Sequence, residues 1–237
     1  HLTIEQRRRD LGGFEVGRVL PSPRRRMVGP FVFFDHMGPV DFAPGLPRSV
    51  DVRPHPHIGL ATVTYLFKGE ITHRDSVGSE LAIRPGEVNW MVAGSGITHS
   101  ERFDRARLEG GHMHGIQAWV ALPTELEETD PSFAHHDSSD LPTFNGPGAQ
   151  GRLVAGTAYG LTAAVRTHSP LFYVHWELQP GARIELPAAF SERAAYVVTG
   201  AAEMDGQAVA AGEMLVFDSD HAIGIAATAA TTLMLLG

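Results

Sequence analysis

Histidine and carboxylate side chains recur at two places in the chain, in a spacing suited to metal binding. His55 and His57 flank a single proline, and His99 and Glu101 flank a single serine further along. Residues i and i+2 of an extended chain point to the same face, so each pair can direct both side chains at one point. Three imidazoles and one carboxylate, without sulfur, suit Fe, Mn, Ni, Cu, Co or Zn. The pattern predicts one divalent transition-metal site.

A purely structural interpretation of the same residues remains open. In that interpretation, His55 and His57 lie beside prolines on a surface loop, and Glu101 pairs with Arg102 or Arg105. The fold distinguishes the two interpretations, because the side chains must converge on a single point if they bind one ion and need not do so otherwise.

Composition and missing motifs narrow the function. The chain has 237 residues, a formal net charge of −8 and no cysteine. The negative charge argues against nucleic-acid binding, and the lack of cysteine excludes disulfides, iron–sulfur clusters and thiol nucleophiles. The sequence contains no nucleophile elbow, phosphate loop or dinucleotide fingerprint, so we expect no organic cofactor. No apolar run reaches the ~20 residues of a membrane span, and no signal-peptide pattern opens the chain, so we expect a cytoplasmic protein that does not bind membranes.

The elements that must position the metal ligands are predicted to be strands. The chain contains 26 Gly and 16 Pro, which interrupt nearly every segment and disfavour long helices. Short segments rich in β-branched and aromatic residues predict strands, with residues 35–50 as a loop leading to the first histidine pair. These strand segments are residues 31–34, 62–67, 88–92, 116–122 and 171–176.

A weak internal repeat indicates two similar β-barrels. Residues 65–69 resemble 196–200, and residues 85–87 resemble 211–213, an offset of about 130 residues. The same offset places Leu186 and Ala188 at the positions of the first histidine pair, so we expect the second barrel to lack the metal ligands. A polar stretch separates the copies. The prediction is an all-β fold with short helices or turns in linkers: an N-terminal metal-binding barrel (residues 1–130), a linker (131–147) and a C-terminal barrel (148–237).

The order of glycines and histidines fits a cupin barrel, and longer stretches resemble one family of double cupins. Residues 53–65 and 85–101, with shorter segments at 31–37 and 114–120, resemble the pirin family of bicupins. The resemblance implies one iron in the N-terminal barrel, held at the positions of His55, His57, His99 and Glu101, and a metal-free C-terminal barrel. Fe(II) is therefore the favoured ion, with Ni, Mn, Cu, Co and Zn as alternatives. Some pirins carry a glutamate where this chain has Ala61, so that ligand is absent here.

The resemblance also implies a reaction. Some pirins resemble quercetinases, which open flavonols such as quercetin with O2. In such a dioxygenase Glu101 would accept the proton of the flavonol hydroxyl, and the substrate would be a flavonol or another small aromatic enol. This oxidoreductase function is the favoured interpretation.

Two other functions remain open. Eukaryotic pirins resemble iron-dependent co-regulators that dock other proteins, and the arginines at residues 7–9 and 24–26 could contact an acidic protein partner. A third interpretation is a cupin isomerase or storage-type barrel with an incidental ion, whose activity would not need the first histidine pair.

Several further side chains have weaker claims. His73 could orient substrate or support a ligand, and the i, i+2 spacing of His112 and His114 could form a second imidazole pair, although a structural role is favoured. His135 and His136 are expected to be solvated. Trp90 and Trp119 are expected in the core or in a pocket wall. Asp218, Asp220 and His221 could bind a stray cation.

Overall fold

Most of the regular structure of the chain is β-strand. The computed structural model describes residues 1–217 and 221–237. In these residues the helical elements are α1 (Asp104–Glu109) and the single turns η1 (Arg48–Val50) and η2 (Thr124–Leu126). The all-β prediction is confirmed. The chain forms two compact units, here called the N-terminal barrel (residues 7–18 and 32–138) and the C-terminal barrel (residues 1–6, 19–31 and 139–237).

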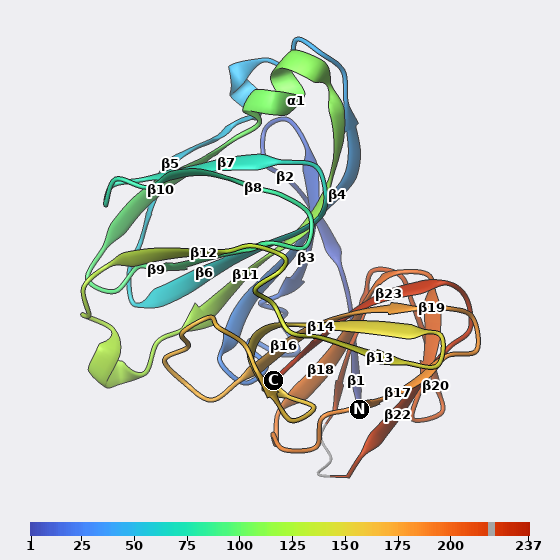
Figure 1. The fold of residues 1–237 in the computed structure, drawn as a ribbon. Helices are drawn as coiled ribbons and strands as arrows, with labels where there is room; N and C mark the ends of the chain where they lie inside the picture. Colours follow the sequence, from blue (N-terminus) through green and yellow to red (C-terminus); the bar gives the residue numbers. More distant parts are fainter. Residues whose placement is uncertain (218–220) are drawn as a thin grey trace. The chain divides into compact units, whose positions relative to one another are not determined.

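The N-terminal barrel consists of two facing sheets (Figure 1). The smaller sheet has the order β5 (Val52–His57), β10 (Ile97–Arg102), β7 (Ile71–Asp75) and β8 (Glu80–Ile83). The larger sheet has the order β12 (Ser132–His136), β9 (Val88–Val92), β6 (Leu60–Lys68), β11 (Gly111–Ala121), β4 (Phe31–Phe42), β3 (Glu15–Leu20) and β2 (Arg7–Asp10).

Strand β4 runs further than the sequence suggested. The prediction of a loop over residues 35–50 is wrong for its first half, because β4 continues through Gly38 and Pro39 to Phe42. The strand lies between β11 and β3, and pairing on both sides outweighs the local preference of glycine and proline for a turn. This extension places Asp35 and Met37 on a regular strand.

The C-terminal barrel repeats the two-sheet arrangement. Its smaller sheet has the order β17 (Arg183–Leu186), β22 (Ile223–Ala227), β19 (Ala201–Met204) and β20 (Gln207–Ala210). Its larger sheet has the order β1 (Leu2–Glu5), β21 (Glu213–Phe217), β18 (Arg193–Thr199), β23 (Thr231–Leu236), β16 (Phe172–Leu178), β14 (Ala149–Ala158) and β13 (Thr143–Gly146), with β15 (Leu161–Thr162) paired to β14.

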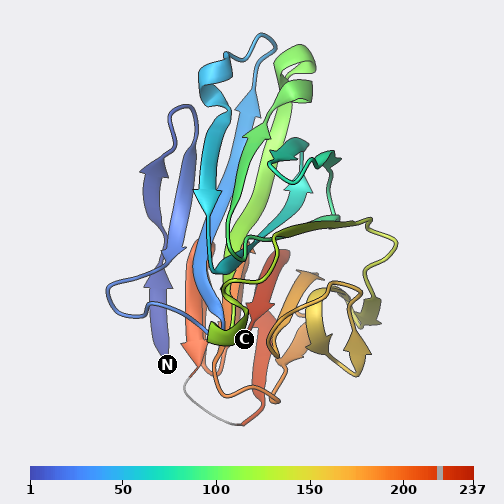
Figure 2. The same ribbon diagram turned by 90° about the vertical axis from the view of Figure 1, so that its left-hand side faces the viewer.

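The polar segment between the barrels and the arginine-rich start of the chain both contain strands. Within residues 131–147, β12 pairs with β9 and β13 pairs with β14. Figure 2 shows β2 and β3, in blue near the N-terminus, side by side as an antiparallel pair. Arg8 on β2 forms an exposed ion pair with Glu15 on β3 at 3.0 Å. The domain limits expected from the sequence and a docking role for the arginines stay predictions.

Among residues 1–217 and 221–237, no helix is both long enough and apolar enough to cross a bilayer.

The turn between β9 and β10 depends on a glycine. Gly94 has a φ of +51°, and a Cβ added there would lie 1.9 Å from the carbonyl oxygen of Thr129. Gly78, between β7 and β8, has a φ of +98° but nothing within 4 Å of such a Cβ. An alanine at residue 78 would therefore have a strained φ without a clash, whereas an alanine at residue 94 would have both.

We predict that Gly94→Ala lowers the free energy of unfolding by more than about 2 kcal/mol, whereas Gly78→Ala costs about 1 kcal/mol, because only the first adds a backbone clash to the strained φ. Urea unfolding of the metal-free protein measures both. An equal or larger loss in Gly78→Ala would contradict the packing described here.

Candidate metal centre

Antiparallel pairing of β5 with β10 brings the two histidine runs together. His55 lies directly opposite His99, and His57 lies opposite Ile97. The register shifts by one residue between His99 and Glu101, which is the signature of a β-bulge. Directly opposite residues on paired strands share a face of the sheet, so one pairing places side chains that are far apart in the sequence around one point.

The three imidazoles converge as the spacing predicted. Ring nitrogens of His55, His57 and His99 all lie within 4.8 Å of one another, a grouping that could hold a metal ion. The Nε2 atoms of His57 and His99 are 3.2 Å apart. Two nitrogens bonded at about 2.1 Å to one octahedral ion lie about 3 Å apart when their bonds are at right angles. His55 donates its Nδ1–H to the carbonyl oxygen of Arg53 at 2.8 Å, which leaves its Nε2 as the lone-pair donor. The donor set fits a divalent cation.

Burial keeps two of these rings in the metal-binding form. Burial, together with a smaller effect of the neighbouring imidazoles, lowers the pKa of His57 to about 4 and the pKa of His99 to about 3. Both side chains are therefore neutral at neutral pH. Metal ions bind the neutral imidazole, so no proton has to be displaced from these two rings.

Glu101 is buried beside the cluster. It lines the same cavity as His55 and His57, and burial raises the pKa of its carboxyl, an effect that His55 opposes. The alternative, in which Glu101 pairs with Arg102 or Arg105, is wrong, because both arginines pair with other carboxylates. Arg102 lies 3.5 Å from Asp51, and Arg105 pairs with Glu109 at 3.0 Å. Glu101 as the fourth metal ligand stays a prediction.

His99 contacts a buried pair formed by a histidine and an aspartate, on the Nδ1 side of its ring. His73 is only 4% exposed, and its Nε2–H donates to Asp75 Oδ2 at 2.8 Å. Asp75 also accepts backbone N–H groups of Val77 and Ser79. Burial raises the pKa of the Asp75 carboxyl, but the hydrogen bonds from His73 and Ser79 outweigh this effect and the net pKa is lowered. Asp75 is therefore a carboxylate at neutral pH.

This contact fixes the tautomer of His99. Because Nε2 of neutral His73 carries the proton, its Nδ1 is an acceptor, and it lies 3.4 Å from Nδ1 of His99. His99 must then donate its own Nδ1–H, which leaves its Nε2 lone pair directed at the cluster. A supporting role for His73 was only one of the options predicted from the sequence, and none was predicted for Asp75. The two residues nevertheless show the same i, i+2 spacing as the ligand pairs.

The cluster opens onto a mostly apolar cavity of about 160 Å³. Trp119 forms part of its wall and contacts His57 edge to face, with 5.0 Å between ring centroids. Phe33 stacks on Trp119 at 4.0 Å. The expected wall role of Trp119 is confirmed, and Trp90 is buried.

The other histidines make contacts that the sequence did not predict. His114 does not pair with His112: its Nε2 lies 2.7 Å from Nε2 of the buried His36, and His112 contacts Asp41. His135 is half-buried and bonds Asn89 at 2.8 Å, so its expected solvation is wrong. It also belongs, with two acidic residues, to a second group that could hold an ion. That group is Glu87, His135 and Asp137. Asp218 and Asp220 of the predicted cation-binding group lie outside the described residues.

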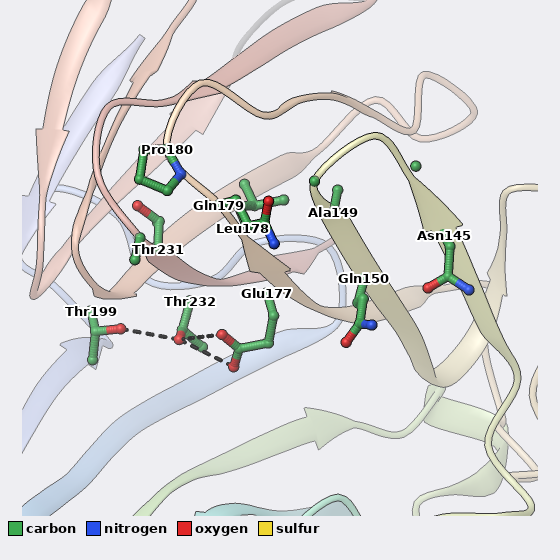
Figure 3. Close-up of a pocket in the computed structure, with 13 residues that line it drawn as sticks. Asn145, Ala149, Gln150, Glu177, Leu178, Gln179, Pro180, Thr199, Thr231 and Thr232 are labelled. Carbon is green, nitrogen blue, oxygen red and sulfur yellow. Dashed lines mark hydrogen bonds between the residues drawn. The ribbon is translucent and has the colours of Figure 1, made fainter.

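The C-terminal barrel contains a cavity with a different lining. This hollow has a volume of about 600 Å³ and is lined mainly by amide, hydroxyl and aliphatic side chains. Figure 3 shows Thr232 between Thr199 and Glu177, to which it is hydrogen-bonded. Its lining holds a single carboxylate and no imidazole, so this hollow lacks the donor set found in the N-terminal barrel.

Comparisons with known proteins agree on one family. The Pirin family model matches residues 13–120, and the model of the Pirin C-terminal cupin domain matches residues 173–237. A protein of Caulobacter vibrioides named Pirin-like protein is 59% identical over 237 residues, which is this whole chain and 82% of that protein. A Pseudomonas aeruginosa protein, provisionally named quercetin 2,3-dioxygenase PA1205, is 46% identical over 160 residues.

The match to the Pseudomonas protein covers 68% of this chain and 49% of that protein, so it spans about half the length of that relative. The crystal structure of a quercetin 2,3-dioxygenase from Acinetobacter baumannii aligns with a TM-score of 0.91 at 34% identity, and covers 99% of this chain and 77% of that one. The expected fold of two cupin barrels is confirmed.

We predict that His73→Phe and Asp75→Asn each weaken the binding of Ni(II) or Zn(II) by roughly 10–100-fold, because His99 loses the hydrogen bond that orients its lone pair. Phenylalanine preserves the contact of ring 73 with Phe133. Isothermal titration calorimetry measures the affinity, and exposed His112→Phe is the control. Affinity equal to that of the control would show that His73 and Asp75 do not position His99.

We also predict that acid destabilises the metal-free protein. Burial lowers the pKa of His36 to about 3, as it lowers those of His57 and His99, whereas an unfolded histidine titrates near 6.5. The unfolded state therefore binds more protons than the folded state below pH 6.5. The free energy of unfolding is unaffected by these histidines above that pH and decreases as the pH falls toward 4. The slope is up to about 1.4 kcal/mol per pH unit for each imidazole.

Urea midpoints between pH 7 and 4.5 measure this slope. His99→Leu should make it shallower, with His136→Gln as the control. An unchanged slope in His99→Leu would contradict a buried neutral imidazole at residue 99.

Proposed function

The chain belongs to the pirin family of double-cupin proteins, and on this basis we propose that it is a metal-dependent dioxygenase that opens flavonols, or aromatic enols of similar shape, with O2. The observation that carries the proposal is the position of the imidazole cluster. His55 and His57 line the same cavity as the aromatic side chains of Phe33 and Trp119. A cation held there would face any aromatic molecule in the cavity. The names of the quercetin dioxygenase relatives support the same chemistry.

The ligands proposed for the ion are His55, His57, His99 and Glu101, with Fe(II) as the favoured ion and Ni, Mn, Cu, Co and Zn as alternatives of similar ligand preference. When bound, the ion would hold the deprotonated enol and O2 together and stabilise negative charge that develops during the reaction. The remaining steps depend on the side chains of this chain.

Glu101 is the proposed base. A flavonol reacts as its enolate, so the hydroxyl proton must pass to a neighbouring group. The carboxyl of Glu101 is buried in the cavity wall, and burial raises its pKa, which strengthens it as a proton acceptor. A proton taken up there is shielded from solvent and remains available for the ring-opened product.

The cavity wall is the proposed binding surface. The stacked rings of Phe33 and Trp119 are 4.0 Å apart and nearly parallel, and His57 holds the indole in place from its edge. A cavity of about 160 Å³ is smaller than the sites that enclose a whole drug-sized ligand. The enol-bearing part of a flavonol would therefore be enclosed, and the rest would extend toward Leu11, which is 43% exposed at the cavity lining.

We predict that Glu101→Gln lowers kcat for flavonol oxidation by at least about 100-fold, because the amide cannot accept the proton. The loss of flavonol absorbance under air, with Fe(II) added, measures turnover. The metal content of each variant is measured by elemental analysis. Glu109→Gln, on the exposed face of α1, is the matched control and should keep full activity.

Two outcomes would contradict the proposal. Full activity of metal-loaded Glu101→Gln would remove Glu101 from the reaction. Metal bound by the unchanged protein without any loss of absorbance would favour the iron-dependent co-regulator.

A further inference from the structure

A buried ion pair forms part of the cavity wall, away from the imidazole cluster. Arg18 on β3 donates from Nε and Nη2 to the two carboxylate oxygens of Asp35 on β4, at 2.9 and 2.8 Å. Both residues line the cavity. The Asp35 side chain is 4% exposed, whereas that of Arg18 is 28% exposed. The carboxylate is therefore enclosed, and the guanidinium is the accessible partner.

The guanidinium is held rigidly. Its Cζ lies 4.5 Å from the centroid of the Phe33 ring, a cation–π contact, and Phe33 also stacks on Trp119. Trp119 in turn contacts His57. A continuous row of rings thus connects the imidazole cluster to Arg18, and a ligand bound at the cluster that extends along this row reaches the guanidinium.

The net charge of the Arg18–Asp35 pair determines which substrate group can bind the guanidinium. The hydrogen bond to Asp35 raises the pKa of Arg18. Burial raises the pKa of Asp35, and the opposing hydrogen bond and charge of Arg18 only reduce this rise. An ion pair of this kind is neutral as a whole, so a second carboxylate at the guanidinium would have to compete with Asp35. A bidentate pair uses two of the five N–H groups of arginine, and the others can donate to an uncharged oxygen.

We propose that Arg18 is a specificity-determining residue that donates a hydrogen bond to a neutral hydroxyl or carbonyl oxygen of the substrate, on the part remote from the reacting enol. This inference rests on the proposed function for the orientation of the substrate. It names the substrate class as polyhydroxylated aromatic enols, in preference to enols whose outer rings carry no oxygen. Asp35 acts as a positioning residue, because it holds the guanidinium rather than contacts the substrate. Phe33 packs against the guanidinium and also forms part of the cavity wall.

The energetic expectation follows from the cost of an unpaired donor. A site built to hydrogen-bond an oxygen binds a ligand without that oxygen less tightly, because the donor loses water and gains no partner. One such bond at a charged donor contributes about 1.5–3 kcal/mol, which corresponds to roughly 10–150-fold in affinity.

The test compares two ligands under nitrogen with the Ni(II)-loaded protein, so that binding is measured without turnover. Quercetin carries hydroxyls on its outer rings, and 3-hydroxyflavone carries only the enol hydroxyl. The shift in flavonol absorbance gives each Kd. The unchanged protein should bind quercetin at least about 10-fold more tightly than 3-hydroxyflavone.

The variants remove the guanidinium without leaving a buried charge unpaired. Arg18→Met combined with Asp35→Asn should abolish the preference for quercetin, with the Kd of 3-hydroxyflavone changed by less than about 2-fold. Arg18→Lys, which keeps the charge beside Asp35, should reduce the preference in part. Arg8→Met, which removes the exposed arginine paired with Glu15, should leave it intact.

A preference that survives the double variant would overturn the inference, as would an equal weakening of both ligands or a failure of the unchanged protein to bind either. Turnover under air is a separate measurement. Loss of preference in the double variant without any turnover by the unchanged protein would support the role of Arg18 and contradict the dioxygenase.

Discussion

The pairing of β5 with β10 is the contact on which the proposed chemistry depends. It sets His55 opposite His99 and encloses the imidazoles far enough from solvent that His57 and His99 stay neutral. Neutral rings at this spacing bring lone pairs together, an arrangement that a divalent cation stabilises. The same burial places a carboxyl, that of Glu101, in an apolar wall where it holds a proton more strongly. The neutral state of these imidazoles and the raised pKa of Glu101 thus have one main physical cause, desolvation by the barrel.

The C-terminal barrel shows what the same pairing does with other residues. Strands β17 and β22 pair with Leu186 opposite Ile223 and Ile184 opposite Ile225, and all four side chains are buried in an apolar core. Their contribution is hydrophobic burial. Aliphatic side chains at these positions stabilise the barrel, whereas imidazoles at the matching strands of the N-terminal barrel leave polar groups that need a partner. The two barrels share one architecture but differ in the side chains that these paired strands bury.

The sequence carried the local part of this account. Residues that lie close together in the chain, such as the i, i+2 histidine pairs and the β-branched segment within β6, were predictable because strand geometry fixes their direction. Contacts set by the barrel were not. Neither Arg18 with Asp35 nor His36 with His114 shows any spacing signal, because each joins different strands across the sheet. The loop predicted over residues 35–50 failed in its first half for the same reason: glycine and proline act locally, whereas β4 is held by two neighbouring strands.

The most direct test is a crystal structure of the protein loaded with Ni(II) or Fe(II), with the ion located by its anomalous scattering. The account predicts one ion per chain in the N-terminal barrel, bonded at about 2.1 Å to His55, His57 and His99, with a carboxylate oxygen of Glu101 completing the protein ligands. An ion found only at Glu87, His135 and Asp137, or imidazoles that stay apart in the presence of excess metal, would contradict it.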